Sequence, residues 1–226
     1  MVYQPHRATA VAVGARDIIG SGILGPIYMI KAALSDFSRR NDWQALRQYG
    51  GGMLNNYGAH AIDQLLYLAN EKAARLRCHL RTIASLGDAD DVVKLVIETE
   101  RGLILDLDIN MATAHALTPL MILGKYGTLR YDGEARTFIV KTYKPDSLVQ
   151  GSVITELAAK DRRYGNAEKI PWEESRIPVN NYAPVDFYEK VYEYMALDSP
   201  PFVPLAETRE VMRIIDACRR DSDLKI

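Results

Sequence analysis

The spacing of hydrophobic residues predicts four helices in this chain. An alanine-rich run over residues 8–19 contains no proline and is followed by closely spaced glycines, which is typical of a helix that ends there. Residues 53–69 also have helical spacing. Two further helices are predicted over residues 184–197 and 205–220, where hydrophobic residues recur every three or four positions and are expected to pack into the core.

The remaining hydrophobic segments have the shorter period of β-strands. Strands are predicted over residues 27–34, 75–86, 92–100, 103–110, 117–124, 127–131 and 137–143. In the fourth of these, Asp106, Asp108 and Asn110 share one face, which predicts a strand with one solvated side. Only short breaks separate the consecutive strands in the middle of the chain, and this favours an antiparallel meander.

The order of these elements defines the predicted fold class. One helix, one strand, a second helix, a series of strands and two final helices indicate an α+β domain, with a large, mostly antiparallel sheet and helices packed on one face. We expect a single domain over residues 1–226. Residues 144–181 are rich in proline, glycine and charged residues, so we expect them to form an irregular excursion.

Composition excludes several classes of protein. Hydrophobic residues make up 48% and charged residues 25% of the 226 residues, which are ordinary globular values. With 28 basic and 29 acidic residues, the chain lacks the basic surface needed for binding nucleic acid. It has no apolar run long enough to cross a membrane and no signal-peptide pattern. Cys78 and Cys218 form no C-x-x-C pair, so we expect free thiols in the cytoplasm.

Residues 20–25 match the dinucleotide-binding pattern G-x-G-x-x-G. That pattern binds a pyrophosphate only where the glycines follow a strand and open a helix. Here a predicted helix precedes the glycines, and Pro26 and a strand follow them. We therefore interpret the segment as a turn and predict no cofactor-binding residue in this chain.

The predicted helix over residues 53–69 carries the candidate chemistry. Asn56, His60 and Asp63 lie at positions i, i+4 and i+7 and share a polar stripe. Its opposite face is hydrophobic, and three glycines precede it, which permit close approach of the backbone. Histidine suits proton transfer near neutral pH, and an asparagine one turn away is placed to hold a substrate hydroxyl or to orient the imidazole.

Two plainer interpretations of this stripe stay open. A polar stripe on an amphipathic helix is often only a solvated surface. A metal-dependent hydrolase that used His60 and Asp63 would need a third ligand, and the sequence shows none, so we predict no metal site.

The run G-G-G-M-L-N-N-Y-G-A-H-A-I-D over residues 50–63 resembles the signature helix in the C-terminal substrate domain of the Gfo/Idh/MocA oxidoreductases. In that family a glycine triplet leads into D-x-x-x-H and then I-D. His60, Ile62 and Asp63 match this pattern, whereas Asn56 replaces the usual Asp. Residues 7–27 and the closing segment 203–217 also resemble the family, so the likeness covers almost the whole chain. It implies a fold like that of the C-terminal domain of dihydrodipicolinate reductase.

The resemblance implies a dehydrogenase that moves a hydride between a sugar or polyol carbon and NAD or NADP. Family members begin with a Rossmann domain that carries the glycine fingerprint and a catalytic lysine in an E-K-P-like segment. Neither occurs in these residues, so we expect the cofactor to be bound mainly by a missing N-terminal domain joined in cis. This chain alone is expected to be inactive. His60 would relay the proton and Asn56 would bind a substrate hydroxyl, without the extra basicity that an aspartate would lend to His60.

The resemblance also indicates residues that meet the small-molecule substrate. The loop before the glycines contains Arg40, a candidate for binding a carboxylate or phosphate, and Trp43, a candidate for stacking on a sugar ring. Asp63 on the helix completes the set, together with Tyr57, which helical geometry puts about 100° from Asn56, where it can reach either the pocket or the core. A solvated loop anchored by Trp43, and a structural hydrogen-bonding role for Asp63, are the plainer interpretations.

Family members commonly pair their sheets face to face, so we expect a homo-oligomer formed through the open sheet face. A stand-alone binding or scaffold module that kept the fold and lost catalysis is the competing hypothesis for the function of the chain.

Overall fold

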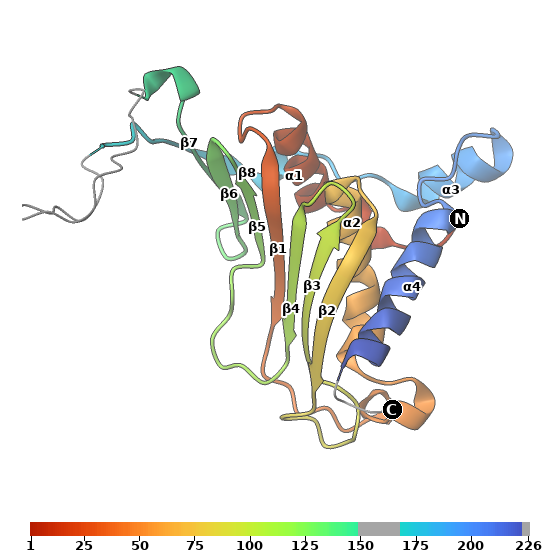
Figure 1. The fold of residues 1–226 in the computed structure, drawn as a ribbon. Helices are drawn as coiled ribbons and strands as arrows, with labels where there is room; N and C mark the ends of the chain where they lie inside the picture. Colours follow the sequence, from red (N-terminus) through yellow and green to blue (C-terminus); the bar gives the residue numbers. More distant parts are fainter. Residues whose placement is uncertain (149–167, 223–226) are drawn as a thin grey trace, which may run out of the picture.

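The computed structural model describes residues 1–148 and 168–222 (Figure 1). The helices are α1 (Ala10–Gly20), α2 (Ala59–Ala69), α3 (Phe187–Ala196) and α4 (Leu205–Asp221). The strands are β1 (Ile27–Ser35), β2 (Ala73–Arg81), β3 (Val92–Thr99), β4 (Ile104–Asn110), β5 (Leu120–Gly124), β6 (Gly127–Asp132), β7 (Thr137–Thr142) and β8 (Glu173–Pro178). Short 3₁₀ turns flank them, including η1 (Pro5–Ala8), η2 (Trp43–Ala45) and η3 (Arg47–Tyr49).

The eight strands form one sheet in the order β2-β3-β4-β1-β5-β6-β7-β8. All neighbouring pairs are antiparallel except β1 and β4, which run parallel with Met29 opposite Ile104. The mostly antiparallel sheet is therefore confirmed, but the simple meander is wrong, because β1 is inserted between β4 and β5. Its hydrophobic residues fit a central strand, and the short breaks later in the chain carry no information about this insertion.

Side-chain alternation gives the sheet one buried and one open face. In β3, Val93, Leu95 and Ile97 are fully buried, whereas Lys94 and Val96 on the other face are not. Helices α1, α2 and α4 cover the buried face (Figure 1), where they share one hydrophobic core with the strands. The predicted α+β architecture with helices on one face is confirmed.

The open face is amphipathic. Lys94 forms ion pairs with Asp106 and Asp108, and Lys31 also pairs with Asp106. These charges confirm the predicted solvated face of the strand now labelled β4.

The edge strand β2 is closed by the end of helix α4. The backbone N–H of Cys78 donates to the Asp221 carboxylate at 2.7 Å, and that of Leu80 donates to the Ser222 hydroxyl at 3.1 Å. Cys78 and Cys218 meet in this contact as buried free cysteines, and hydrogen bonding to Cys78 together with burial raises the pKa of the Cys218 thiol. Side chains of α4 thus satisfy edge donors that would otherwise be open to another strand.

Two details of the C-terminal half differ from the prediction. Phe187 of α3 is buried, but Tyr188, Tyr192 and Met195 are mostly exposed, so this helix is not packed into the core as its spacing predicted. The excursion predicted over residues 144–181 contains strand β8, which pairs with β7 through its backbone. The other part of that prediction, residues 149–167, lies outside the described residues.

Among the described residues, no helix combines the length and hydrophobicity needed to cross a membrane.

Candidate functional site

The entrance to helix α2 is a tight and unusual turn. Residues Leu54–Gly58 form a π-helical turn, which is wider than the α-helix that continues from Ala59. Before it, a side chain on Gly51 would collide with the backbone of Gln44, and one on Gly52, whose φ is 109°, would collide with Asp90. Close approach of the backbone, as predicted, is what these glycines permit.

Asp90, from the loop between β2 and β3, caps this helix. Its carboxylate accepts a hydrogen bond from the backbone N–H of Leu54 at 2.8 Å. Burial raises the pKa of Asp90, while this backbone hydrogen bond works in the opposite direction. The helix entrance is therefore occupied by a carboxylate of the chain itself.

The segment before α1 lies along α2 and makes three contacts with it. Gln4 hydrogen-bonds to His60, the backbone oxygen of His6 accepts from Gln64 at 3.2 Å, and Arg7 binds Asp63. These contacts follow successive turns of the helix, so residues 4–7 have a fixed position relative to it.

Asp63 is a structural residue. It is 0% exposed, and its two carboxylate oxygens accept hydrogen bonds of 2.6 Å from Nε and Nη2 of Arg7. Glu207 at the start of α4 also binds Arg7. Burial alone would lower the pKa of Arg7, but the hydrogen bonds and charges of Asp63 and Glu207 raise it. Both oxygens are bound in the interior, which favours the structural hydrogen-bonding interpretation of Asp63 over the substrate-binding one.

His60 is half-buried and is oriented by the segment over residues 4–7. Its Nδ1 lies 2.6 Å from Oε1 of the buried Gln4. The imidazole of His6 packs against it, with ring centroids 4.6 Å apart and planes tilted by 35°. Burial and the nearby His60 lower the pKa of His6, although Asp63 acts to raise it.

Asn56 does not orient His60. Its Nδ2 donates to Oε1 of Gln44 at 3.3 Å. A straight α-helix would align Asn56 with His60, but Asn56 lies within the wider π-helical turn, and its amide is hydrogen-bonded to Gln44. Asn56 therefore connects the start of this helix to η2, which contains Gln44.

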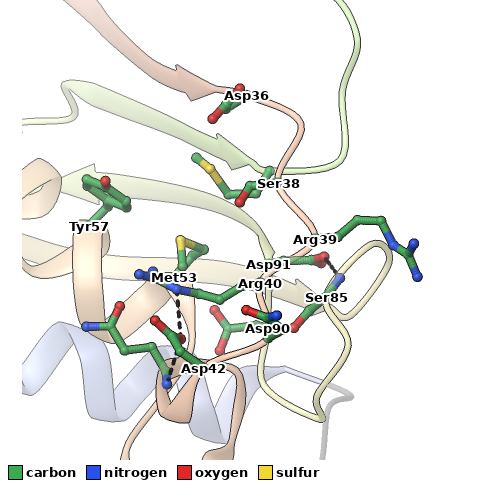
Figure 2. A pocket seen from close by; sticks show the side chains of 13 residues that line it. Asp36, Ser38, Arg39, Arg40, Asp42, Met53, Tyr57, Ser85, Asp90 and Asp91 are labelled. Carbon is green, nitrogen blue, oxygen red and sulfur yellow. Dashed lines mark hydrogen bonds and ion pairs between the residues drawn. The ribbon is translucent and has the colours of Figure 1, made fainter.

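A cleft of about 290 Å³ opens beside the start of this helix (Figure 2). The residues that line it come from the segment after β1, the β2–β3 loop, the helix entrance and the end of β4: Asp36, Ser38, Arg39, Arg40, Asn41, Asp42, Gln44, Met53, Tyr57, Ser85, Asp90, Asp91 and Met111. Two predicted substrate-binding residues, Arg40 and Tyr57, are thus brought together. Trp43 lies on η2, is 58% exposed and is not among the lining residues.

The charges of the cleft are largely engaged with the chain itself. Arg40 forms an ion pair with Asp42, with Nε and Oδ1 3.0 Å apart. Asp91 accepts hydrogen bonds from three successive backbone N–H groups, those of residues 83–85. In Figure 2 the side chain of Arg39 extends away from the other labelled residues. With four aspartates against two arginines, the lining is acidic.

Neither a cofactor fingerprint nor a metal cluster is formed by the described part of the chain. The glycines over residues 20–25 lie between the end of α1 and the start of β1, the reverse of the order that binds dinucleotides. In the described ranges, no three His, Cys, Asp or Glu side chains are grouped to hold a metal ion. Asp63, the carboxylate of the metal hypothesis, is bound to Arg7.

Sequence reasoning missed Gln4, Gln44 and Asp90. Each contacts this helix or its entrance from a different segment of the chain. The separation from the partner residue is 36 positions for Asp90, 56 for Gln4 and 12 for Gln44, so no helical spacing links them. His6 carried no assigned role in the sequence, yet it packs directly on His60.

An eight-stranded sheet is covered by helices on one face, and the polar cleft opens beside the entrance of α2, without His60 among the residues that line it. The family model described as the GFO/IDH/MocA C-terminal domain matches residues 13–130, more than half of the chain. The chain therefore belongs to this family of oxidoreductases, as a C-terminal domain.

Solved structures share the fold at low identity. An NAD-binding protein from Listeria innocua has a TM-score of 0.79 and 18% identity, over 99% of this chain and 64% of that one. An oxidoreductase from Bacillus cereus has a TM-score of 0.73 and 15% identity, over 96% and 63%. The chain thus spans less than two thirds of the length of these proteins. No curated protein gives a significant match.

Proposed function

We propose that this chain is the substrate-binding and proton-transferring part of an NAD(P)-dependent oxidoreductase that acts on a neutral sugar, polyol or related small molecule. The observation that carries the proposal is the placement of His60. It is half-buried, it is held at Nδ1 by Gln4, and it lies one helical turn from Tyr57, which lines the cleft. Imidazole in such a position is suited to accept a hydroxyl proton near neutral pH.

The residues of this chain do not fit a dinucleotide. A pyrophosphate needs a helix entrance with free backbone N–H groups. At α2 the Asp90 carboxylate already accepts from Leu54, and its charge would repel the phosphates. We therefore propose that the cofactor is bound by a separate dinucleotide-binding domain, in cis, as the resemblance implies.

The cleft favours an uncharged, polyhydroxylated substrate. Arg40 is neutralised by Asp42, and the other described charges of the lining are mainly carboxylates, so a phosphate or carboxylate substrate would be repelled. Hydroxyl groups can donate to carboxylates and exchange hydrogen bonds with Ser38 and Asn41. The ion pair with Asp42 therefore disfavours the anion-binding role predicted for Arg40.

In the proposed reaction the cofactor accepts the hydride and this chain accepts the proton. Oxidation of an alcohol removes a hydride, which a bound nicotinamide accepts, and a hydroxyl proton. In our proposal His60 takes that proton as a general base and returns it in the reverse direction. Tyr57 and the amides of Gln44 and Asn56 orient the remaining hydroxyls. Because Asn56 is neutral and hydrogen-bonded to Gln44, it adds no negative charge beside His60.

We also propose that the open sheet face joins two copies of the chain. Its ion pairs among Lys31, Lys94 and Asp106 are flanked by Met29 and Met121, which gives the mixed surface of a protein interface.

Calorimetric titration with NAD⁺, NADH, NADP⁺ and NADPH tests whether the cofactor is bound by a separate domain and not by residues 1–226. The chain of residues 1–226 and the full gene product that contains it are titrated in parallel. We expect heat of binding only with a gene product that supplies a dinucleotide-binding domain. Binding to residues 1–226 alone would contradict the proposal, and absence of binding in both samples would favour the scaffold hypothesis.

A further inference from the structure

The hydrogen bond between Gln4 and His60 bears on which ring nitrogen of His60 carries the proton. Oε1 of Gln4, a carbonyl oxygen, lies 2.6 Å from Nδ1 of His60. A carbonyl oxygen only accepts hydrogen bonds, so the contact is favourable only when Nδ1 carries the proton. In neutral His60 the other nitrogen, Nε2, is then the one with a free lone pair.

The position of Gln4 is fixed by its surroundings. Gln4 is only 5% exposed, and Arg7, three residues later, is anchored to the buried Asp63 by two hydrogen bonds of 2.6 Å. Between them, the backbone oxygen of His6 accepts from Gln64. The segment therefore cannot slide along α2 without breaking a buried ion pair, which costs far more than one neutral hydrogen bond.

One further contact restricts the ring of His60, and its neighbour one helical turn away does not bond to it. The imidazole of His6 packs on it at 4.6 Å between centroids. Asn56, the neighbour one turn away on the same helix, donates to Gln44 instead. Among the described residues, Gln4 is consequently the one whose side chain is hydrogen-bonded to the ring of His60.

We propose that Gln4 is a positioning residue that holds neutral His60 in its Nδ1–H tautomer and so reserves Nε2 as the proton acceptor. The importance of this for catalysis rests on the proposed function, but the tautomer itself is measurable without activity. Free histidine prefers the opposite tautomer, so the structure makes a distinctive prediction.

Long-range ¹H–¹⁵N correlation NMR of the histidine-labelled chain, at about pH 8 where an ordinary histidine is neutral, reports the tautomer directly. His60→Gln assigns the His60 signals. We expect the Nδ1–H form in the wild type. We expect Gln4→Leu to shift the ratio of the tautomers by about tenfold towards Nε2–H, since a hydrogen bond of ordinary strength is lost. Gln4→Glu keeps an acceptor and should retain the wild-type tautomer.

The signals of His79 and His115 serve as internal controls for folding, because neither side chain is hydrogen-bonded to Gln4 in the part of the chain that the structure describes. In the active gene product, Gln4→Leu should lower kcat more than it raises KM, and Gln4→Glu should restore kcat. A wild-type His60 protonated at Nε2, or a tautomer ratio unchanged by Gln4→Leu, would overturn the proposal. A wild-type gene product that has the Nδ1–H tautomer of His60 but lacks the proposed activity would instead contradict the proposed function.

Discussion

Arg7 and Asp63 form a buried ion pair whose exposed counterpart occurs in the same chain. Arg7 and Asp63 are 2% and 0% exposed, whereas the pair Arg75 and Glu98, with the same two-fold hydrogen bonding, is 75% and 38% exposed. Removing the charge of Asp63 leaves the buried Arg7 with a weaker partner, the half-exposed Glu207, and an incompletely compensated charge in the interior. We expect Asp63→Asn to lower the free energy of unfolding by about 3 kcal/mol.

The matched control is Glu98→Gln, which should cost less than about 1 kcal/mol because water replaces the lost partner. Urea unfolding followed by circular dichroism measures both variants. Equal losses in the two variants would contradict the structural role assigned to Asp63.

His6 predicts a pH dependence of stability. Burial and His60 lower the pKa of His6 in the folded protein, so between that lowered value and the ordinary 6.5 the unfolded chain binds more protons than the folded one. Stability therefore rises with pH through this interval and falls on acidification below 6.5. Midpoints of urea unfolding from pH 8 to pH 5 should show this fall in the wild type and a smaller one in His6→Gln. An identical slope in both proteins would contradict it.

At this scale the sequence predicts residue types better than their partners. His60 was identified because a histidine within the G-G-G…H-x-I-D pattern is distinctive. The residues that bind this helix are not predicted, because Gln4 and Asp90 belong to segments distant from it in the sequence. Helical spacing places Asp63 on a polar stripe, but in the structure Asp63 is buried and hydrogen-bonded to Arg7.

Helix α1 packs against the sheet through a glycine. A Cβ at Gly14 would lie 2.5 Å from the Tyr182 ring and 2.6 Å from the Phe138 ring, whereas one at Gly20, on the same helix, would have no atom within 4 Å. We expect Gly14→Ala to lower the free energy of unfolding by about 1–3 kcal/mol through overpacking. Gly20→Ala should leave it unchanged or raise it by up to about 1 kcal/mol. Thermal unfolding compares the two, and a stabilised Gly14→Ala protein would contradict the packing described.

At the scale of elements, long periodic segments were predictable and their pairing was less so. Helices α1, α2 and α4 and strands β3 and β4 follow directly from hydrophobic spacing and lie where it placed them. The central position of β1 depends on contacts with β4, about 75 residues later, which local patterns do not encode. Strand β8 is not predicted because its exposed, charged residues lack the hydrophobic alternation of a strand, although its backbone pairs with β7.

The whole molecule presents an open sheet face that our account assigns to a second copy. Met121 lies on this face beside Lys31. We expect the wild type to sediment as a dimer or larger assembly. Met121→Lys should shift it towards the monomer, because an added charge beside Lys31 would be desolvated in the interface. Met212→Lys, on the exposed side of α4, is the control and should leave assembly unchanged. A wild type that stays monomeric at high concentration would contradict the assignment.

The central claim is that His60 transfers the proton in an NAD(P)-dependent oxidation. The most direct test is the formation of reduced nicotinamide by the full gene product with a panel of neutral polyols and aldoses. Removal of a general base typically costs about 10²–10⁴-fold in rate, so we expect His60→Gln to lower kcat/KM by that range. His115→Gln, at an exposed histidine, should retain wild-type activity. A His60→Gln enzyme as active as the wild type, or no cofactor-dependent oxidation of any neutral substrate, would contradict the account.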